Sequence, residues 1–270
     1  VLYKLWEGSW DDDAVIRDRD RKAYTDPDKV RAINHEGAFF KVAGPHLCQP
    51  SPQRTPVLFQ ASGSPAGLEF AARHAEVVFT GGLTAQDVRR NIASTRAGVR
   101  AQGRDPQAIK FLVQAGVIVG RNDEEVAAKL DAYRQLMSVR GALVHAQSDI
   151  DLLAWPPETP ISTVTAGRGQ GRAGGIGRGV LAGFDPHWTV RQVLQRLESF
   201  DRDRYFVAGT PSVVTDTIER WLDEDDIDGI NLRQYMSFET ARDFIELVVP
   251  ELRRRGRFRE SYQAGETLRE

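Results

Sequence analysis

The stretch TPVLFQASGSPAGLEFAARHAEVVF, residues 55–79, decides the fold class of this chain. Its first part, PVLFQA, is a continuous apolar run of strand length. The part that follows, SPAGLEFAARHA, places Leu68, Ala71, Ala72 and Ala75 on one face of a helix. The apolar run EVVFT then starts a second strand. A strand, a helix and another strand in this order predict a parallel α/β sheet covered by helices.

The same alternation recurs further along the chain. EVVFT leads into a helix that Gly103 ends, and IKFLVQAGVIVG leads into a helix capped by Asn122 or Asp123. Thr210 and Pro211 start another helix as its N-cap and its first residue, and DGINLR precedes the closing helix. The sequence therefore shows about four strand and helix pairs.

Eight such pairs are needed to close a (β/α)8 barrel. The pairs seen here follow a stretch of helical spacing that opens at Val1 and an extended arm at residues 33–44. We therefore expect an α/β fold that is the C-terminal half of a TIM barrel, forming a single domain over residues 1–270.

The alternation breaks between residues 141 and 187, which are rich in Gly, Pro and Arg. An irregular segment of this length inside a regular fold is usually functional or disordered, and we expect an insertion that could act as a lid. His145 and His187 flank the segment and could approach a substrate. Regular structure resumes in a helix that runs from Thr189 to Phe200.

Net charge and cysteine content limit the classes of binding partner and the cellular compartment that we expect. The net charge is -2, so neither nucleic acid nor an anionic membrane is an expected partner. The single cysteine, Cys48, excludes an intramolecular disulfide and favours a reducing compartment, with the cytoplasm as the default. No group of His, Cys, Asp and Glu has metal-ligand spacing, and the Gly-rich tract does not follow a strand, so we expect neither a metal nor a dinucleotide site.

Five segments, which occur in one order along the chain, carry a family resemblance: LYKLWEGSWDDDAVI, INHEGAFFKVAGP, SPQRTPVLFQASGSPAGLEFAARHAEVVFT, VAGTPSVVTDTIERWLDEDDIDGINLR and VVPELRRRGRFRESYQAGETLRE. They resemble the flavin-dependent monooxygenases of the nitrilotriacetate and dibenzothiophene-sulfone type, within the bacterial luciferase-like superfamily. The resemblance implies a TIM-barrel enzyme that receives reduced FMN from a separate flavin reductase. Such an enzyme reacts the flavin with O2 to a flavin peroxide and inserts one oxygen atom into a small organic substrate. A homo-oligomer is also expected.

The resemblance also implies a site for the cofactor. Ser62-Gly63-Ser64 joins a strand to a helix, and phosphate groups favour helix N-termini at the carboxyl ends of strands. Carried over by position, Gly63 and Ser64 match the pair that contacts the FMN phosphate in the family, with Gly63 offering only its N–H. The alternative is that Ser64 merely caps the helix before Pro65.

Four polar residues at or near strand ends could face the flavin ring or the substrate, or could be satisfied core residues: Gln60, Thr80, Gln114 and Asn231. No catalytic residue is assigned, because the flavin supplies the oxygen activation and the protein mainly positions it. Two other functional readings stay open. The chain could be a catalytically inactive half barrel that needs a complementary N-terminal chain, or an F420-dependent oxidoreductase on the same barrel.

Overall fold

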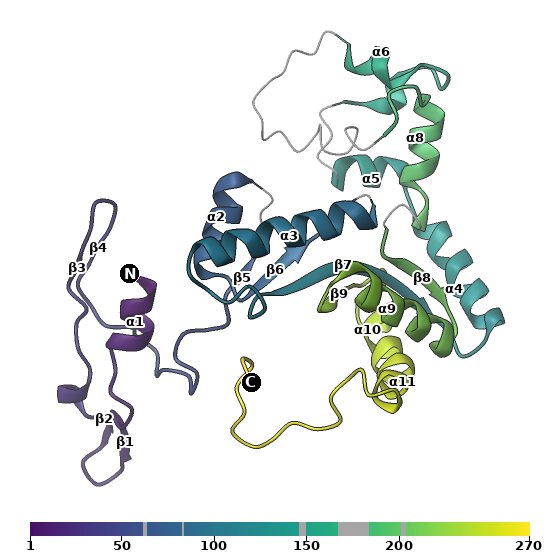
Figure 1. Cartoon of the computed structure of the whole chain (residues 1–270). Coiled ribbons are helices and arrows are strands. Elements are labelled where there is room, and N and C mark those ends of the chain that lie inside the picture. The colour runs from purple at the N-terminus through teal and green to yellow at the C-terminus, as the bar shows by residue number, and fades with distance from the viewer. Residues whose placement is uncertain (62–63, 83, 146–149, 167–183, 201–203) are drawn as a thin grey trace. The chain divides into compact units, whose positions relative to one another are not determined.

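The computed structural model describes residues 1–61, 64–82, 84–145, 150–166, 184–200 and 204–270 (Figure 1). Its contacts divide the chain into two compact units, one of Val1–Leu58 with Ser261–Glu270 and one of Phe59–Glu260. The second unit holds the parallel sheet and both cavities described below.

The first unit consists of a short helix and two small hairpins. Helix α1 spans Leu2–Gly8, strands β1 (Val15–Asp18) and β2 (Ala23–Thr25) pair antiparallel, and β3 (His35–Glu36) pairs antiparallel with β4 (Lys41–Val42). The opening helix and the extended arm were both predicted. The β1–β2 hairpin was not, because its charged residues show no apolar alternation.

Five parallel strands form the sheet of the second unit: β5 (Phe59–Gln60), β6 (Val77–Thr80), β7 (Lys110–Val119), β8 (Phe206–Gly209) and β9 (Gly229–Arg233). β7 is the central strand and pairs with β6, β8 and β9. Gly116 pairs with Phe206 of β8 and with Arg233 of β9, so β8 and β9 lie on opposite edges of β7.

The helices that follow these strands begin where the sequence predicts. Helix α2 spans Pro65–His74, α3 Ala85–Ala101, α4 Asp123–Leu136 and α9 Pro211–Asp225. The predicted cap at Asn122 is confirmed, since its side chain accepts a hydrogen bond from the Glu125 N–H at 2.9 Å. The closing helix is divided into α10 (Glu239–Asp243), a π-helical turn over Phe244–Val248 and α11 (Val249–Arg254).

One face of the sheet is covered, and the other is open around Gln114 but covered at Gly116 and Ile118. On β7, Phe111, Val113 and Ala115 are fully buried and pack in one core with residues of α2, α3, α9 and α11. Gln114, on the other side of the same strand, is exposed. This alternation positions polar side chains of β7 on the uncovered side of the sheet.

Between α4 and β8 the described residues form a small helical cluster, which we call the insertion. Its helices are α5 (Val139–His145), α6 (Ile161–Thr165) and α8 (Val190–Leu197), with a 3-10 turn at Leu152–Ala154. They lie together in Figure 1 around their own core, which includes Leu152, Val164 and Val193. The Gly and Pro content of this segment hid α5 and α6 from the sequence analysis.

Strand β8 is a second element that the sequence analysis missed. Its four residues, Phe206–Gly209, precede the predicted helix start at Thr210, so the described chain carries five parallel strands where about four were expected. The expected parallel α/β sheet is confirmed. The extent of a single domain and the lid role of residues 141–187 stay predictions.

Candidate functional site

The N-terminus of α2 is the predicted phosphate site. Ser64 is its N-cap, and the Ser64 hydroxyl accepts a hydrogen bond from the Gly67 N–H at 3.1 Å. Pro65 is the first helical residue. The helix-cap contact of Ser64, which is the alternative to phosphate binding, is therefore present. It uses the hydroxyl as an acceptor, which is compatible with donation by the same hydroxyl to an anion. Gly63 lies outside the described residues.

A cavity of about 240 Å3, which we call the strand-end cavity, lies between α2, α3 and the carboxyl ends of β5 and β6. Thr80, one of the predicted strand-end residues, lines it. Gln60 does not, and its amide instead lies 3.4 Å from the carbonyl oxygen of Gly67. The lining consists of Ala61, Leu68, Val78, Phe79, Thr80, Gly81, Asn91, Ser94 and Thr95.

The polar part of the strand-end cavity is held by local hydrogen bonds. The Asn91 amide donates to the carbonyl oxygen of Gly81 at 2.8 Å, and the Thr95 hydroxyl donates to the carbonyl oxygen of Asn91 at 2.9 Å. None of the described residues that line the cavity is charged. An anion placed there would meet hydroxyl and amide groups without a carboxylate to repel it.

The predicted residues Gln114 and Asn231 are brought together. They lie directly opposite each other on β7 and β9, and both are exposed. Phe79 pairs with Leu112, two residues before Gln114, and so lies on the same face. The ring of Phe59 lies 5.7 Å from that of Phe79. The open face therefore carries two exposed aromatic rings and two amide side chains.

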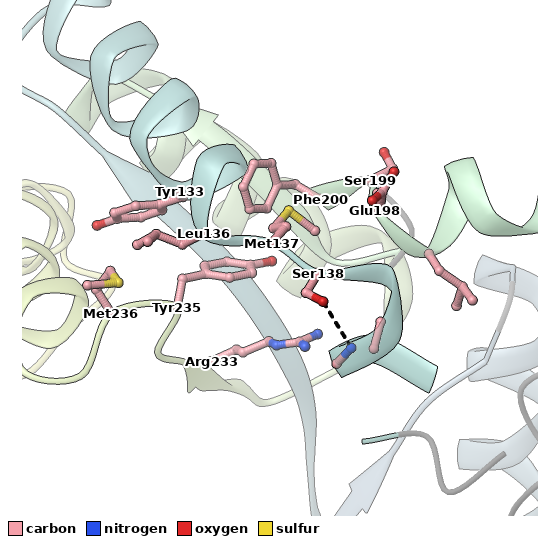
Figure 2. Close-up of a pocket in the computed structure, with 13 residues that line it drawn as sticks. Tyr133, Leu136, Met137, Ser138, Glu198, Ser199, Phe200, Arg233, Tyr235 and Met236 are labelled. Carbon is pink, nitrogen blue, oxygen red and sulfur yellow. Dashed lines mark hydrogen bonds between the residues drawn. The ribbon is translucent and has the colours of Figure 1, made fainter. Parts of the chain in front are cut away.

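A second cavity of about 350 Å3 lies where the carboxyl end of β9 meets α4 and the insertion (Figure 2). We call it the aromatic cavity, because Tyr133, Phe200 and Tyr235 form much of its wall. The other lining residues are Leu136, Met137, Ser138, Gly141, Ala142, Leu197, Glu198, Ser199, Arg233 and Met236. No local sequence pattern predicts this cavity, because its lining comes from segments far apart in the chain.

Arg233 and Tyr235 shape one side of the aromatic cavity. Arg233 is the last residue of β9, and its guanidinium carbon lies 5.4 Å from the centroid of the Tyr235 ring. Tyr235 in turn lies over the sheet at Gly116, where an added Cβ would come within 2.3 Å of the Tyr235 hydroxyl oxygen. Gly116 is thus the position at which the sheet leaves room for the tyrosine.

Behind the aromatic cavity, polar groups fix the position of Tyr133. Its hydroxyl lies 3.2 Å from a carboxylate oxygen of Glu239, to which it donates. Burial, followed by the negative charge of Glu239, raises the pKa of Tyr133 to about 12. Nearby, the Lys129 ammonium contacts Asp243 at 2.7 Å and the carbonyl oxygen of Val119 at 2.8 Å. Tyr133 therefore stays neutral at physiological pH and contributes its ring to the cavity wall.

The remaining polar candidates lie outside these cavities. His187 is exposed in the loop before α8, and His74 lies beside Phe70 with ring centroids 4.9 Å apart and the ring planes tilted by 46°. The side chain of His145 lies outside the described part of the structure. The imidazole of His46 contacts the backbone oxygen of Cys48, not its sulfur, at 3.1 Å.

The described residues contain no group of three or more His, Cys, Asp and Glu side chains that could hold a metal ion. None of the helices in the described ranges is both long and apolar enough to cross a membrane.

A parallel sheet, covered by helices on one face and with cavities at the carboxyl ends of its strands, defines a partial (β/α) barrel. The chain belongs to the luciferase-like monooxygenase family, whose model matches residues 3–151. The resemblance seen in the five sequence segments is confirmed.

The relatives are named oxygenases. The chain is 40% identical over 273 residues to the long-chain alkane monooxygenase of Geobacillus thermodenitrificans (strain NG80-2) and 39% identical over 271 residues to the dimethyl-sulfide monooxygenase of Hyphomicrobium sulfonivorans. Each match covers 100% of this chain and 56% of the relative. The chain therefore spans about half the length of the curated relatives it matches.

Solved structures agree with this assignment. The crystal structure of a long-chain alkane monooxygenase matches with a TM-score of 0.75 and 39% identity, covering 97% of this chain and 56% of the other. A riboflavin lyase, solved with modified FMN and its substrate riboflavin, matches with a TM-score of 0.72 and 32% identity over 97% of this chain and 57% of that one.

Proposed function

We propose that this chain is part of a monooxygenase that uses reduced FMN and O2 to insert one oxygen atom into a small organic substrate. The proposal is supported by membership of the luciferase-like monooxygenase family and by relatives named as alkane and dimethyl-sulfide monooxygenases. The observation that carries it is the strand-end cavity beside the N-terminus of α2.

The residues present at this place fit an FMN phosphate. The Ala66 and Gly67 N–H groups lie in the first turn of α2, at the positive end of the helix dipole. The Gly67 N–H donates to the Ser64 hydroxyl, and Pro65 has no N–H. Ser64 adds a hydroxyl. The adjoining cavity offers Thr80, Asn91 and Ser94 without a lining carboxylate in its described part. Ser64, together with the N–H of Gly63, is the proposed phosphate contact.

The open face of the sheet is where the flavin ring would be oriented. Phe59 and Phe79 provide apolar surface, and the Gln114 and Asn231 amides can both donate and accept hydrogen bonds along the polar edge of a flavin. The chemistry supplied by reduced FMN there would be the activation of O2. The protein's part would be to bind, to orient and to exclude water from the reacting atoms.

A separate flavin reductase is the proposed source of reduced FMN, with the flavin acting as a co-substrate. One relative, 34% identical over 275 residues, is named nitrilotriacetate monooxygenase component A, a name that implies a further component in that system. Because the chain spans only part of its relatives, the complete catalytic unit is proposed to need the remaining barrel strands as well.

Incorporation of labelled oxygen tests the proposal. The natural protein that contains this chain would be supplied with FMN, NADH, a flavin reductase and 18O2, with an alkane or dimethyl sulfide as substrate. The expected result is a product that carries one 18O atom and forms only when all components are present. Consumption of O2 that yields hydrogen peroxide alone with every substrate would favour the inactive half-barrel reading.

A further inference from the structure

We propose that Arg104 is a positioning residue for the FMN phosphate. Its guanidinium holds the C-terminal end of α2 and thereby fixes the N-terminal end of the same helix, where Ser64 lies. Arg104 lines neither cavity, so it would act through α2 and not by contact with the flavin. This role rests on the proposed binding of FMN at α2.

The guanidinium of Arg104 contacts three backbone carbonyl groups at the end of α2. Nη1 donates to the carbonyl oxygen of Ala72 at 2.9 Å and lies 3.3 Å from that of Ala71, and Nη2 donates to that of Ala75 at 2.7 Å. The last carbonyl groups of a helix lack partners within the helix, and a cation there complements the negative end of the helix dipole. Arg104 therefore ties the last turn of α2 to the segment that follows α3.

A glycine turn at the end of α3 places Arg104 beside α2. Gln102 is the C-cap of α3, and Gly103 follows with φ 73°, a conformation that glycine adopts readily. The Gly103 N–H donates to the carbonyl oxygen of Arg100 at 3.0 Å, and the Arg104 N–H donates to that of Val99 at 3.2 Å. These two bonds form a Schellman motif. The backbone of Arg104 is thus anchored on α3, while its side chain holds α2.

Helices α2 and α3 lie side by side and together line the strand-end cavity (Figure 1). An added Cβ at Gly98 of α3 would lie 3.3 Å from the Cβ of Ala72, so close packing sets the spacing of the two helices. Nearer their N-termini, α2 contributes Leu68 to the cavity lining and α3 contributes Asn91 and Thr95. The position of α2 on α3 therefore determines the width of the cavity beside the proposed phosphate site.

Helix α2 depends on such contacts because it is short. It has 10 residues and spans about 15 Å, and isolated helices of this length are unstable in water. Its buried residues, Ala71 and Ala72, lie at the end that Arg104 holds. Its first turn carries no acidic residue, so a bound phosphate would meet the positive end of the dipole without repulsion from that turn. Loss of the Arg104 contacts should loosen the whole helix, including the turn that begins after Ser64.

Paired flavin titrations test this role in the natural protein that contains this chain. Reduced FMN and reduced riboflavin, which lacks the phosphate, would be titrated anaerobically, and the ratio of the two affinities measures the preference for the phosphate. Arg104→Met should lower this ratio about three- to tenfold and leave the riboflavin affinity nearly unchanged, because only part of the molecules would then hold α2 in the binding position. Arg104→Lys keeps the charge without the planar fork and should recover part of the ratio.

Arg89→Met is the matched control. Arg89 also belongs to α3, but it donates to the carbonyl oxygen of Glu224 at 2.9 Å, at the C-terminal end of α9. Its replacement removes the same kind of helix-end contact away from α2 and should leave the flavin ratio unchanged. Hydrogen exchange without flavin should become faster in α2 for Arg104→Met and in α9 for Arg89→Met.

The outcomes distinguish a failure of this role from a failure of the proposed function. An unchanged ratio in Arg104→Met, an equal loss of affinity for both flavins, or the same fall of the ratio in Arg89→Met would overturn the positioning role. Should Arg104→Met fail to fold, Arg104→Lys carries the same comparison. A wild type that binds both flavins equally would contradict the phosphate site itself, and this result needs no variant.

Discussion

Gly116 controls the aromatic cavity at the scale of a single residue. It is buried in β7, pairs with strands on both sides and lies under the Tyr235 hydroxyl. Any side chain at position 116 would clash with Tyr235, and the Tyr235 ring cannot move away without leaving the cavity wall. Packing against Tyr235 therefore requires a glycine at position 116, whereas no turn conformation does.

Gly116→Ala should lower the free energy of unfolding by about 1–3 kcal/mol, because the new Cβ overpacks the site. Tyr235→Phe in the same chain should recover part of this loss, since it removes the atom at 2.3 Å. Urea unfolding measures both effects. Gly141→Ala, where an added Cβ lies 3.5 Å from Ser138, is the control. Equal effects of the two alanines would contradict the clash.

The sequence predicted local side-chain roles better than distant ones. The helix caps at Ser64 and Asn122 were predictable because each needs only its own residue and an N–H three residues later. Arg233 and Tyr133 were not singled out, because their cavity is assembled from elements about 100 residues apart in sequence. The pairing of Gln114 with Asn231 depends in the same way on strand register.

The C-terminal helix shows how one element is fixed by charge. Arg255, the C-cap of α11, contacts Asp216 and Glu219 of α9, the latter at 2.6 Å, and also Glu251 at 2.8 Å. Hydrogen bonds from Arg254 and then Arg255 lower the pKa of Glu251 to about 2. This group therefore binds a proton less readily in the folded protein than in the unfolded chain.

The lowered pKa of Glu251 determines how the stability of the fold changes with pH. The stabilisation from Glu251 is present above its ordinary pKa of 4.5 and is lost as pH falls toward 2. Glu251→Gln should thus be less stable than the wild type at pH 7, and the two should converge as pH falls through this range. Thermal unfolding at each pH measures the difference in stability between Glu251→Gln and the wild type, with Glu260→Gln as the control. A gap that stays constant with pH would contradict the ion-pair account.

The insertion is an element with its own core, and its stability should be local. Leu152→Ala removes a fully buried side chain and should cost about 2–5 kcal/mol. Hydrogen exchange should accelerate in α6 and α8 and remain slow in β7, which belongs to the main core. Leu153→Ala, at a position 43% exposed, is the adjacent control. Equal acceleration in β7 would show that insertion and sheet unfold together.

For the whole molecule, the parallel α/β sheet was predictable from the alternation of apolar runs and helical stripes. Strand β8 was missed because a run of four residues carries little periodicity, and the insertion helices were missed because Gly and Pro dominate their surroundings. Local sequence patterns predict neither the pairing of β9 with β7 nor the aromatic cavity, since both arise from long-range packing.

The central claim is that the N-terminus of α2 binds the phosphate of FMN, and one titration tests it most directly. Anaerobic binding of reduced FMN and of reduced riboflavin, which lacks the phosphate, would be compared in wild type, Ser64→Ala and Ser64→Asp. Aspartate keeps the helix cap but repels a phosphate, whereas alanine loses the cap and about 1 kcal/mol of stability. The account predicts that the wild type prefers FMN and that Ser64→Asp loses this preference while remaining as stable as the wild type. Equal affinity of the wild type for both flavins, or an unchanged FMN preference in Ser64→Asp, would contradict it.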